Sequence, residues 1–280
     1  MGGKLIVITG AASGIGRALA LNFAAEGTRL YLSDRNGEGL AETAAEARAR
    51  GAAEVVPDIV DVSDLTHVTS WADTILATGG VPDEIHHVAG VASWGDPRTY
   101  PQEKWRRVID INLFGSVHMV QAFSKHIATG PRKRKDRRKF VFVSSAAGII
   151  GLPWHAAYSA SKGGVIAMCE VLRFDLAPFG VDVHVVAPGA VDTPLVHSID
   201  IHGVDQTNSR VVKAKKLFQG HAVTPEKAAE KIRTGVRKGT FLITTSRDIR
   251  FGRWAQVNFP WAYAGFMRLL NRGFRWAAKG

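Results

Sequence analysis

Cysteine is almost absent from this chain, and its scarcity limits the class of protein. Cys169 is the only cysteine among 280 residues, so no disulfide can form within the chain, and a disulfide-stapled secreted fold is excluded. A single thiol inside a predicted helix is typical of a packed, unreactive side chain. The cysteine content therefore favours a reducing compartment, and we expect a cytoplasmic protein.

Long apolar runs are also missing. No segment has the length that spanning a bilayer requires, and no charged stretch followed by an apolar core opens the chain. Residues 4–10 instead predict a strand that leads directly into a glycine turn. Ile6 stands where N-myristoylation needs Ser or Thr, so that lipid anchor is not expected.

Acidic residues are few relative to basic ones. The chain has 36 Lys and Arg against 25 Asp and Glu, a net charge of +11. Residues 131–139 (PRKRKDRRK) carry seven basic residues and one acidic residue, and a second basic concentration follows Arg247. Without these segments the charges nearly balance, so the excess belongs to appendages. No nucleic-acid-reading module accompanies them, so we expect no nucleic-acid partner and interpret 131–139 as a solvated loop.

Strand-like and helix-like patterns alternate along most of the chain. The predicted strands are 4–9, 29–34, 53–62, 84–90, 139–145, 181–189 and 240–245, and the predicted helices are 15–25, 38–50, 65–77, 102–127, 156–179 and 225–238. Such alternation predicts right-handed βαβ units with helices on both faces of a sheet. The strands are near-continuous apolar runs, which fits a sheet covered on both sides. We predict an α/β, doubly wound fold with a seven-stranded, mainly parallel sheet.

No internal repeat or linker marks a second domain, so residues 1–280 are interpreted as one domain. Residues 191–224 are polar and poorly periodic, which indicates a substrate lid. Residues 246–280 mix aromatic and basic side chains at helical spacing. Two interpretations of this extension stay open: a helix in peripheral contact with a membrane, or a segment that packs on a neighbouring subunit and rims the substrate pocket. Either one favours an apolar, lipid-like substrate.

A glycine-rich loop, TGAASGIG at 9–16, joins the first predicted strand to the first helix. Gly10 permits the tight turn, Gly14 lets the backbone approach a pyrophosphate, and Gly16 lets helix and strand pack closely. The helix N-terminus then points at the phosphates. Three glycines alone are often a mere turn, but the strand–turn–helix context favours a Rossmann-like dinucleotide site. The loop residues expected at the cofactor are Gly10, Ser13, Gly14, Ile15 and Gly16.

Asp34 and Arg35 are the candidate selectors of the cofactor. Asp34 ends the second strand 18 residues after Gly16, where a carboxylate can accept both ribose hydroxyls of an adenosine. That carboxylate would repel a 2′-phosphate, which favours NAD over NADP. The Arg35 guanidinium could instead pair with a 2′-phosphate, and a surface turn before Asn36 is the structural alternative for Asp34.

Tyr158 and Lys162 lie four residues apart at the start of a predicted helix, so they share one face. A phenol with a pKa of about 10 is a poor base at neutral pH, and a neighbouring ammonium lowers that pKa by stabilising the phenolate. Alone, such a pair is usually a solvated helix face. Ser145 ends the fifth strand 13 residues earlier, which makes the group a candidate acid/base site.

Together these motifs resemble those of the short-chain dehydrogenase/reductase family, from Leu5 to about Thr245. The loop at 9–16 is similar to the family's TGxxxGxG, and residues 188–193 (PGAVDT) are similar to its nicotinamide-contacting segment. The resemblance implies a catalytic tetrad of Asn112, Ser145, Tyr158 and Lys162. Besides the loop and the two selectors, it implies cofactor contacts from Asp61, Val62, Ala89, Gly90, Tyr158, Lys162, Pro188, Gly189, Val191 and Thr193.

One departure from the family pattern stands after the fourth strand, where NNAG reads HVAG at 87–90. The first Asn of that motif is usually structural, so His87 predicts altered support of the central sheet and not lost activity. His86 and His87 lie on an apolar strand without further ligands nearby, and no metal is expected.

The resemblance also implies the chemistry. Tyr158 removes the alcohol proton in oxidation and donates it in reduction, while hydride moves between the carbinol carbon and the nicotinamide. Lys162 lowers the pKa of Tyr158 and binds the nicotinamide ribose, Ser145 holds the substrate oxygen, and Asn112 supports a proton relay through Lys162. The predicted activity is that of an alcohol dehydrogenase or carbonyl reductase.

The sequence also predicts an oligomer and leaves one alternative function open. The segment 163–174 is apolar over most of its helical circumference, which indicates a second contact surface and a homodimer or homotetramer. The alternative is a regulator that senses NAD(H) on the same fold without turnover. A sensor does not need the four tetrad residues, so their presence favours the enzyme.

Overall fold

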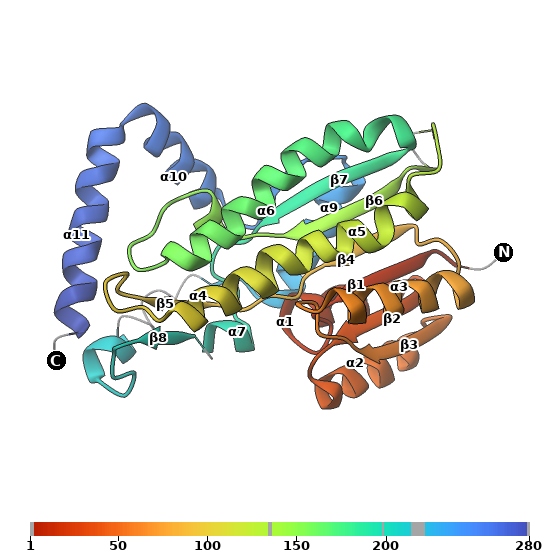
Figure 1. Cartoon of the computed structure of the whole chain (residues 1–280), viewed down its shortest axis with the longest axis horizontal. Helices are drawn as coiled ribbons and strands as arrows, with labels where there is room; N and C mark the ends of the chain where they lie inside the picture. The colour runs from red at the N-terminus through yellow and green to blue at the C-terminus, as the bar shows by residue number, and fades with distance from the viewer. Residues whose placement is uncertain (1–2, 134–135, 198, 214–221, 279–280) are drawn as a thin grey trace.

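A seven-stranded parallel sheet forms the centre of the molecule in the computed structural model, which describes residues 3–133, 136–197, 199–213 and 222–278 (Figure 1). In spatial order the strands are β3 (Glu54–Ile59), β2 (Arg29–Asp34), β1 (Leu5–Thr9), β4 (Glu84–His87), β6 (Arg138–Val143), β7 (Val181–Ala187) and β9 (Leu242–Thr244). Every neighbouring pair is parallel. The α/β, doubly wound, Rossmann-like prediction is confirmed.

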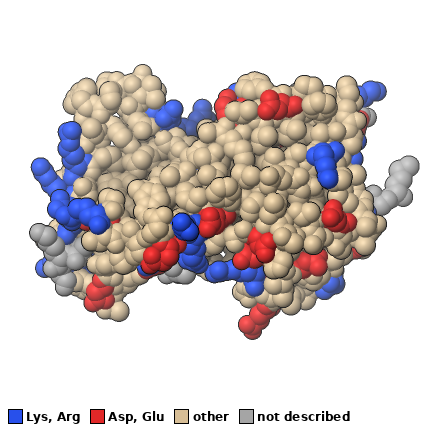
Figure 2. Space-filling view, in the orientation of Figure 1, with Lys and Arg blue, Asp and Glu red and all other residues tan. Residues whose placement is uncertain are grey.

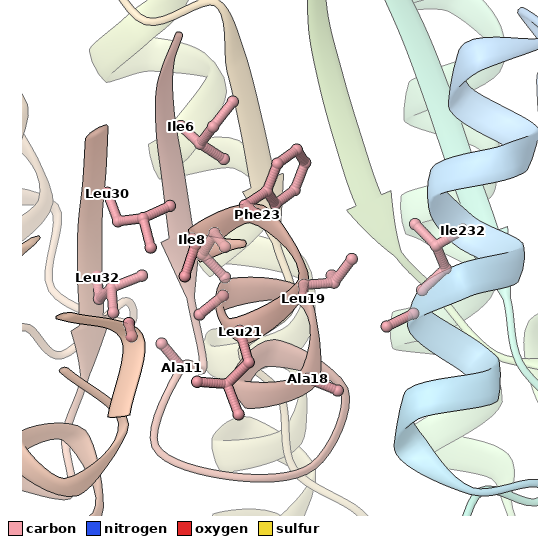
Figure 3. Close-up of a cluster of buried hydrophobic side chains, with 14 of the residues drawn as sticks. Ile6, Ile8, Ala11, Ala18, Leu19, Leu21, Phe23, Leu30, Leu32 and Ile232 are labelled. Atoms are coloured by element: carbon pink, nitrogen blue, oxygen red, sulfur yellow. The ribbon is translucent and has the colours of Figure 1, made fainter. Parts of the chain in front are cut away.

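Helices cover both faces of the sheet, because successive strand residues point to opposite sides. Ile6 and Ile8 of β1 pack on one face, and Leu5 and Val7 pack on the other. The first face is covered by α1 (Gly14–Ala24), α2 (Gly37–Ala49) and α9 (Pro225–Arg237), and Figure 3 shows part of this cluster. The second face is covered by α3 (Leu65–Thr78), α5 (Gly115–Ile127) and α6 (Ala156–Asp175).

Local capping residues explain where several helices begin. Thr224 precedes α9, its hydroxyl oxygen accepts a hydrogen bond from the Lys227 amide (3.4 Å), and Pro225 occupies the first turn. The Asp64 carboxylate accepts from the Thr66 amide (2.8 Å) at the start of α3. These interactions satisfy amides that lack a partner within the helix, so the sequence-based starts agree with the structure.

A π-helical turn interrupts the segment predicted as one helix over 102–127. The segment consists of α4 (Gln102–Ile109), the π-turn η1 (Asp110–Phe114) and α5. Such turns insert an extra residue and often occur at functional sites. Asn112 is buried at the centre of this one. Two short 3-10 turns, η3 (Ala146–Gly148) and η4 (Ala177–Phe179), follow β6 and α6.

The segment predicted as a lid lies between β7 and α9. An isolated parallel bridge between Val191 and Val223 joins its two ends. Within it are α7 (Pro194–His197) and β8 (Asp200–His202), and β8 pairs with β5 (Ser93–Gly95) in a small ribbon that the sequence did not predict. Residues 198 and 214–221 of the predicted lid lie outside the described residues.

The C-terminal extension consists of two helices, α10 (Arg247–Asn258) and α11 (Pro260–Ala278). They meet at an elbow and run along the left side of the molecule in Figure 1, away from the central sheet. None of the helices in the described part of the chain combines the length and the apolar character that crossing a membrane requires.

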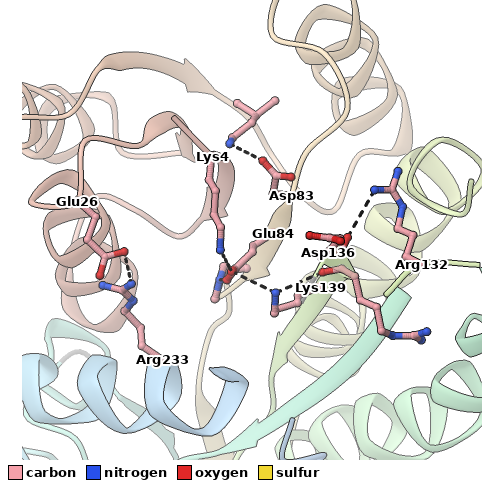
Figure 4. Close-up of polar contacts among 11 residues, drawn as sticks. Lys4, Glu26, Asp83, Glu84, Arg132, Asp136, Lys139 and Arg233 are labelled. Carbon is pink, nitrogen blue, oxygen red and sulfur yellow. Dashed lines mark hydrogen bonds and ion pairs between the residues drawn. The ribbon is translucent and has the colours of Figure 1, made fainter. Parts of the chain in front are cut away.

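The basic run at 131–139 is anchored, which corrects its interpretation as a solvated loop; its residues 134–135 lie outside the described residues. Arg137 forms an ion pair with Asp182 (2.6 Å) and donates to the Val181 carbonyl (2.9 Å). Lys139 and Lys4 both approach the Glu84 carboxylate (3.6 and 3.7 Å; Figure 4). Much of this positive charge therefore pairs with carboxylates and carbonyls at the amino ends of the strands.

Candidate active site

A cavity of about 1260 Å³ lies at the carboxyl ends of the parallel strands. It is lined by the segments that follow β1, β2, β4, β6 and β7, where the strand order reverses between β1 and β4. Loops diverge at such a reversal, which leaves a crevice for a ligand. All the predicted cofactor residues line this cavity, together with Ser145. Among the predicted site residues, only Asn112 does not line it.

The glycine loop has the compact form that a phosphate site needs. Gly10 and Gly14 have left-handed backbone, with φ of 69° and 53°. A methyl group on Gly16 would lie 2.0 Å from the Gly10 carbonyl oxygen, so the first turn of α1 packs directly on the loop. Ser13 immediately precedes α1 and lines the cavity. The free amides at this helix start can therefore face an anion.

Asp34 has a structural role as well as a position on the cavity wall. Its Oδ2 accepts a hydrogen bond from the Ala12 amide (3.0 Å), and its Oδ1 accepts from the Asn36 amide (3.0 Å). The carboxylate thus joins β2 to the glycine loop, a contact that the sequence alone did not indicate. Each oxygen keeps a further lone pair for a ribose hydroxyl.

Arg35 and Asp61 lie at the same end of the cavity as Asp34. The pKa of Asp61 is lowered mainly by its hydrogen bond from the Ser63 hydroxyl, and the nearby Arg35 guanidinium lowers it further. Arg35 and Asp61 therefore lie close enough for their charges to interact.

The segment expected at the nicotinamide closes the opposite wall. A methyl group on Gly14 would lie 2.9 Å from Thr193 Cγ2, so residues 188–193 approach the glycine loop closely. The Pro188 carbonyl accepts from the Ala146 amide (2.8 Å), and the Gly189 amide donates to Thr245 Oγ1 (3.1 Å). These bonds tie the segment to the ends of β6 and β9.

Tyr158, Ser145 and Lys162 converge where β6 meets α6. The Tyr158 phenol is hydrogen-bonded to the Ser145 side chain. One turn further along α6, Lys162 Nζ donates to the Val143 carbonyl at the end of β6 (2.9 Å). The Ser145 hydroxyl oxygen also accepts from the Ala147 amide (3.1 Å), which fixes its rotamer. The three side chains are thus held by the strand end and the helix start.

Asn112 is buried behind this group and does not face the cavity. Its Nδ2 donates to the Val91 carbonyl and to Ser161 Oγ (both 3.0 Å), and its Oδ1 accepts from the Val91 amide (2.8 Å). A methyl group on Gly90 would lie 3.0 Å from both Asn112 Oδ1 and Lys162 Nζ. The amide therefore joins the π-turn to α6 and to the segment after β4.

Comparison with known proteins decides the family. The family model for the short chain dehydrogenases matches residues 4–202. This chain belongs to the short-chain dehydrogenase family. The predicted resemblance is therefore confirmed for the greater part of the chain.

Two relatives and one solved structure show how far the similarity extends. A probable oxidoreductase EphD of Mycobacterium bovis is 34% identical over 85% of this chain, and the match spans 40% of that relative's length. A cyclopentanol dehydrogenase of Comamonas is 31% identical, covering 82% of this chain and 88% of the relative. A short-chain dehydrogenase from Burkholderia phymatum in complex with NAD superposes with a TM-score of 0.80 at 27% identity, covering 91% and 93% of the two chains.

His87 replaces the Asn of the short-chain dehydrogenase pattern and takes part in the support of the segment after β4. Thr9 Oγ1 accepts from the amides of Val88 (3.1 Å) and Ala89 (3.2 Å) and lies 2.9 Å from His87 Nδ1. The Thr9 proton is thus directed to Nδ1, so the ring proton resides on Nε2. Burial is the main reason that the pKa of His87 falls to about 3, and the Lys162 charge adds to it.

The pKa values of the two central catalytic candidates are governed by burial. Burial raises the pKa of Tyr158, and the hydrogen bond with Ser145 opposes that rise. Burial lowers the pKa of Lys162 to about 8. The sequence predicts that Lys162 lowers the pKa of Tyr158, and this role stays a prediction. In the structure the group that opposes the rise is Ser145, and the Lys162 ammonium donates to the Val143 carbonyl.

The remaining end of the cavity has a mainly apolar lining. Ten apolar residues contribute: Val91, Ala92, Trp94, Ile111, Ile150, Leu152, Leu195, Val196, Ile199 and Ile249. Arg107, His155, Asp200 and Asp248 add charged or titratable side chains. Leu195, Val196 and Ile199 lie in the predicted lid and Ile249 in the predicted extension, whereas the other six belong to no motif and were missed by the sequence analysis.

His155 is a defined hydrogen-bonding group within that apolar end. Its Nδ1 lies 2.7 Å from the Pro153 carbonyl, so Nδ1 must carry the proton. Its ring packs on Trp94, with 3.9 Å between the centroids. Burial lowers its pKa to about 4, which keeps it neutral above pH 5. The preceding residue, Trp154, has a φ of 68°, a left-handed conformation that only tertiary contacts can hold.

Proposed function

We propose that this protein is a nicotinamide-dependent oxidoreductase that interconverts an alcohol and a carbonyl compound. The observation that carries the proposal is one shared cavity. The glycine loop and Asp34 line one end of it, and Ser145, Tyr158 and Lys162 line the wall beside its apolar end. Binding and proton transfer are therefore available within one site.

The chain's own residues supply the proton chemistry. A bound nicotinamide would accept hydride from the carbinol carbon, or return it to a carbonyl carbon. Tyr158 takes the hydroxyl proton in oxidation and donates a proton in reduction. Ser145 donates to the substrate oxygen and lowers the pKa of the phenol. Lys162 binds the ribose hydroxyls. Asn112 holds the segment after β4 against α6 through its hydrogen bonds to Val91 and Ser161.

We propose NAD as the preferred cofactor. The Asp34 carboxylate would accept the ribose hydroxyls and repel a 2′-phosphate. The proximity of the Asp61 carboxylate to Arg35 supports this choice. The Burkholderia structure was solved with NAD, which also agrees with it.

The proposed substrate is an apolar alcohol or ketone of the steroid, retinoid or long-chain class. The support is the lining of the substrate end, to which ten apolar side chains contribute. A substrate with many hydroxyl groups would bury most of them against this apolar surface, which is costly. The Comamonas relative is named for cyclopentanol, itself an apolar alcohol.

Replacing Tyr158 with Phe tests the proposal directly. Because this change removes only the transferable proton, we expect turnover of an apolar alcohol panel to fall at least about a thousandfold. NAD affinity, measured by calorimetry, should stay within about twofold. Turnover within tenfold of the unchanged protein would assign the acid/base to another group. Tight NAD binding with no turnover of any substrate by the unchanged protein would favour the NAD(H)-sensing regulator.

A further inference from the structure

The C-terminal arm, defined as residues 247–278 of α10 and α11, is attached to the body through one side of α11. Tyr263 donates its hydroxyl to the Gly151 carbonyl (2.8 Å), and Phe274 stacks on Trp154 (6.1 Å between centroids). Met267 lies between these positions along the helix and is partly buried. The inward side of α11 is thus positioned by residues four and seven apart, which lie on one side of a helix.

The outward side of α11 is apolar although it faces solvent. Trp261 is 77% exposed, Leu269 64%, Trp276 60% and Phe266 56%. Phe251, Trp254 and Phe259 add exposed rings at the elbow between the two helices. Contiguous exposed apolar surface of this kind is rare on a protein that meets only water.

Arginines accompany this apolar strip, and α11 itself supplies no carboxylate; Asp96 of the body lies near Arg275. Residues 249–280 contain five Arg and one Lys and no Asp or Glu. Arg268, Arg272 and Arg275 are exposed beside the apolar side chains on α11. Figure 2 shows basic side chains gathered along the edge where α11 lies. Six of the eleven net positive charges thus belong to the last 32 residues.

We propose that the C-terminal arm docks on an anionic lipid surface, lying in the plane of the interface. Trp261, Phe266, Leu269 and Trp276 would enter the headgroup region, while the arginines contact lipid phosphates. Tryptophan near both ends of α11 fits this depth, because indole prefers the membrane–water interface. A second copy of the arm would instead bring arginine against arginine, so charge complementarity favours the lipid.

Docking would bring the active-site cavity to the membrane. Ser246, Asp248 and Ile249, at the start of α10, line the cavity, so the arm is continuous with its rim. An apolar substrate dissolved in the bilayer would then reach the site over a short path. This consequence rests on the proposed substrate class, whereas the docking itself rests only on the surface of the arm.

The test measures co-sedimentation of the full-length protein with vesicles, without any substrate. We expect binding to vesicles of phosphatidylcholine with one-third phosphatidylglycerol (~30%), and at least tenfold weaker binding to phosphatidylcholine alone. Raising the salt to about 0.5 M should weaken the anionic binding strongly, since charges are screened. Equal binding to both vesicle types, or none to either, would overturn the proposal.

Two arm variants with matched controls locate the contact. The triple change Arg268→Gln, Arg272→Gln and Arg275→Gln should weaken binding by about fivefold per charge. A matched control removes three positive charges from exposed positions on the body, through Arg106→Gln, Lys227→Gln and Arg237→Gln. This control should weaken vesicle binding far less. The changes Trp261→Ser, Phe266→Ser and Leu269→Ser should abolish binding, whereas Leu65→Ser with Val81→Ser should not.

Two further measurements separate docking from misfolding and from self-association. Brominated lipids should quench tryptophan fluorescence in the unchanged protein and much less in a Trp261→Phe, Trp276→Phe variant that still binds vesicles. Light scattering should give the same mass for the unchanged protein and the serine variant. A smaller mass for the serine variant, without vesicle binding by the unchanged protein, would show that a second copy covers the arm.

Discussion

At the scale of single residues, the site depends on side chains that hold a loop as well as face a ligand. Asp34 is the clearest example, because its two oxygens accept amides from the glycine loop and from the following turn. Asn112 uses its whole amide in the same way. A substitution at such a position changes the loop geometry and the ligand contacts at the same time. An experiment that tests one of these residues therefore needs a variant of the same size and shape.

Cofactor choice can be tested at Asp34. Asp34→Asn keeps the size and one of the two acceptor oxygens but removes the charge, so we expect NAD binding to weaken about tenfold and the preference over NADP to narrow. Calorimetric titration with both dinucleotides measures this change. Arg35→Gln is the matched control and should leave NAD affinity nearly unchanged. If the unchanged protein binds NADP tenfold more tightly than NAD, Arg35 is the selector.

His87 makes the protein sensitive to acid in a predictable window. Its pKa is about 3 in the folded chain and about 6.5 when unfolded. Between those values the unfolded state binds a proton that the native state does not, so stability falls as the pH falls below about 6.5. The loss attributable to His87 at pH 5 is about 2 kcal/mol.

Replacing His87 with Asn, the family's residue, should remove that share of the pH dependence. Urea unfolding at pH 7 and at pH 5 measures it, and a smaller difference between the two pH values is expected for the variant. The exposed His67 provides the control. His67→Asn should not change the difference in unfolding free energy between pH 7 and pH 5. An unchanged difference in the His87→Asn protein would contradict the assignment.

At the scale of elements, close backbone contacts set the shape of the cofactor end. The first turn of α1 touches the glycine loop at Gly16, where a methyl group would lie 2.0 Å from a carbonyl oxygen. A backbone atom cannot rotate away as a side chain can. The loop and α1 therefore act as one unit, and so do the π-turn and α6, which Asn112 joins.

Gly16→Ala tests that contact. We expect unfolding free energy to fall by about 1–3 kcal/mol from overpacking and NAD affinity to fall by at least tenfold, because the loop must move. Thermal unfolding and calorimetry give the two values. Gly265→Ala on α11 meets nothing within 4 Å and should be neutral or slightly stabilising. Full NAD affinity in Gly16→Ala would show that the contact is not required.

At the scale of the whole molecule, two surfaces carry most of the large apolar side chains that are more than half exposed. One is the C-terminal arm, and the other is the outer side of α6, where Val171 and Phe174 are more than half exposed. We propose that the α6 surface is the subunit interface of a homo-oligomer, as its apolar circumference predicts. The two surfaces would then have different partners.

Charged substitutions on α6 test the interface. The pair Val171→Asp and Phe174→Asp should shift the assembly to a smaller species, because burying a carboxylate without a partner is costly. Light scattering coupled to gel filtration measures the mass. The pair Leu65→Asp and Val81→Asp alters comparable exposed positions and should not change it. An unchanged mass for the α6 pair would place the interface elsewhere.

The amino-acid sequence by itself determined the fold class and the family, and it predicted which residues line the cavity of the proposed cofactor and catalytic site. Those features depend on local periodicity and on short motifs, in which each residue acts on its near neighbours in the chain. Even the departure at His87 was visible as a broken motif. The handedness of βαβ units narrows the possible strand orders to a few, and the structure shows which one the chain adopts.

Three features became visible only in the tertiary structure. They are the set of residues that lines the substrate end of the cavity, the hydrogen bond between Asp34 and the glycine loop, and the side of the arm that faces solvent. The Ser93–Gly95 and Asp200–His202 ribbon joins segments more than a hundred residues apart, and His155 enters the cavity from a strained turn. Such contacts form only when segments that are distant in the sequence pack together and exclude water. No hydrophobic periodicity or motif spacing encodes them. A helix also does not specify from its own sequence which of two apolar sides the body will cover. That choice, made by contacts such as Tyr263 with Gly151, leaves Trp261 and Leu269 facing outward.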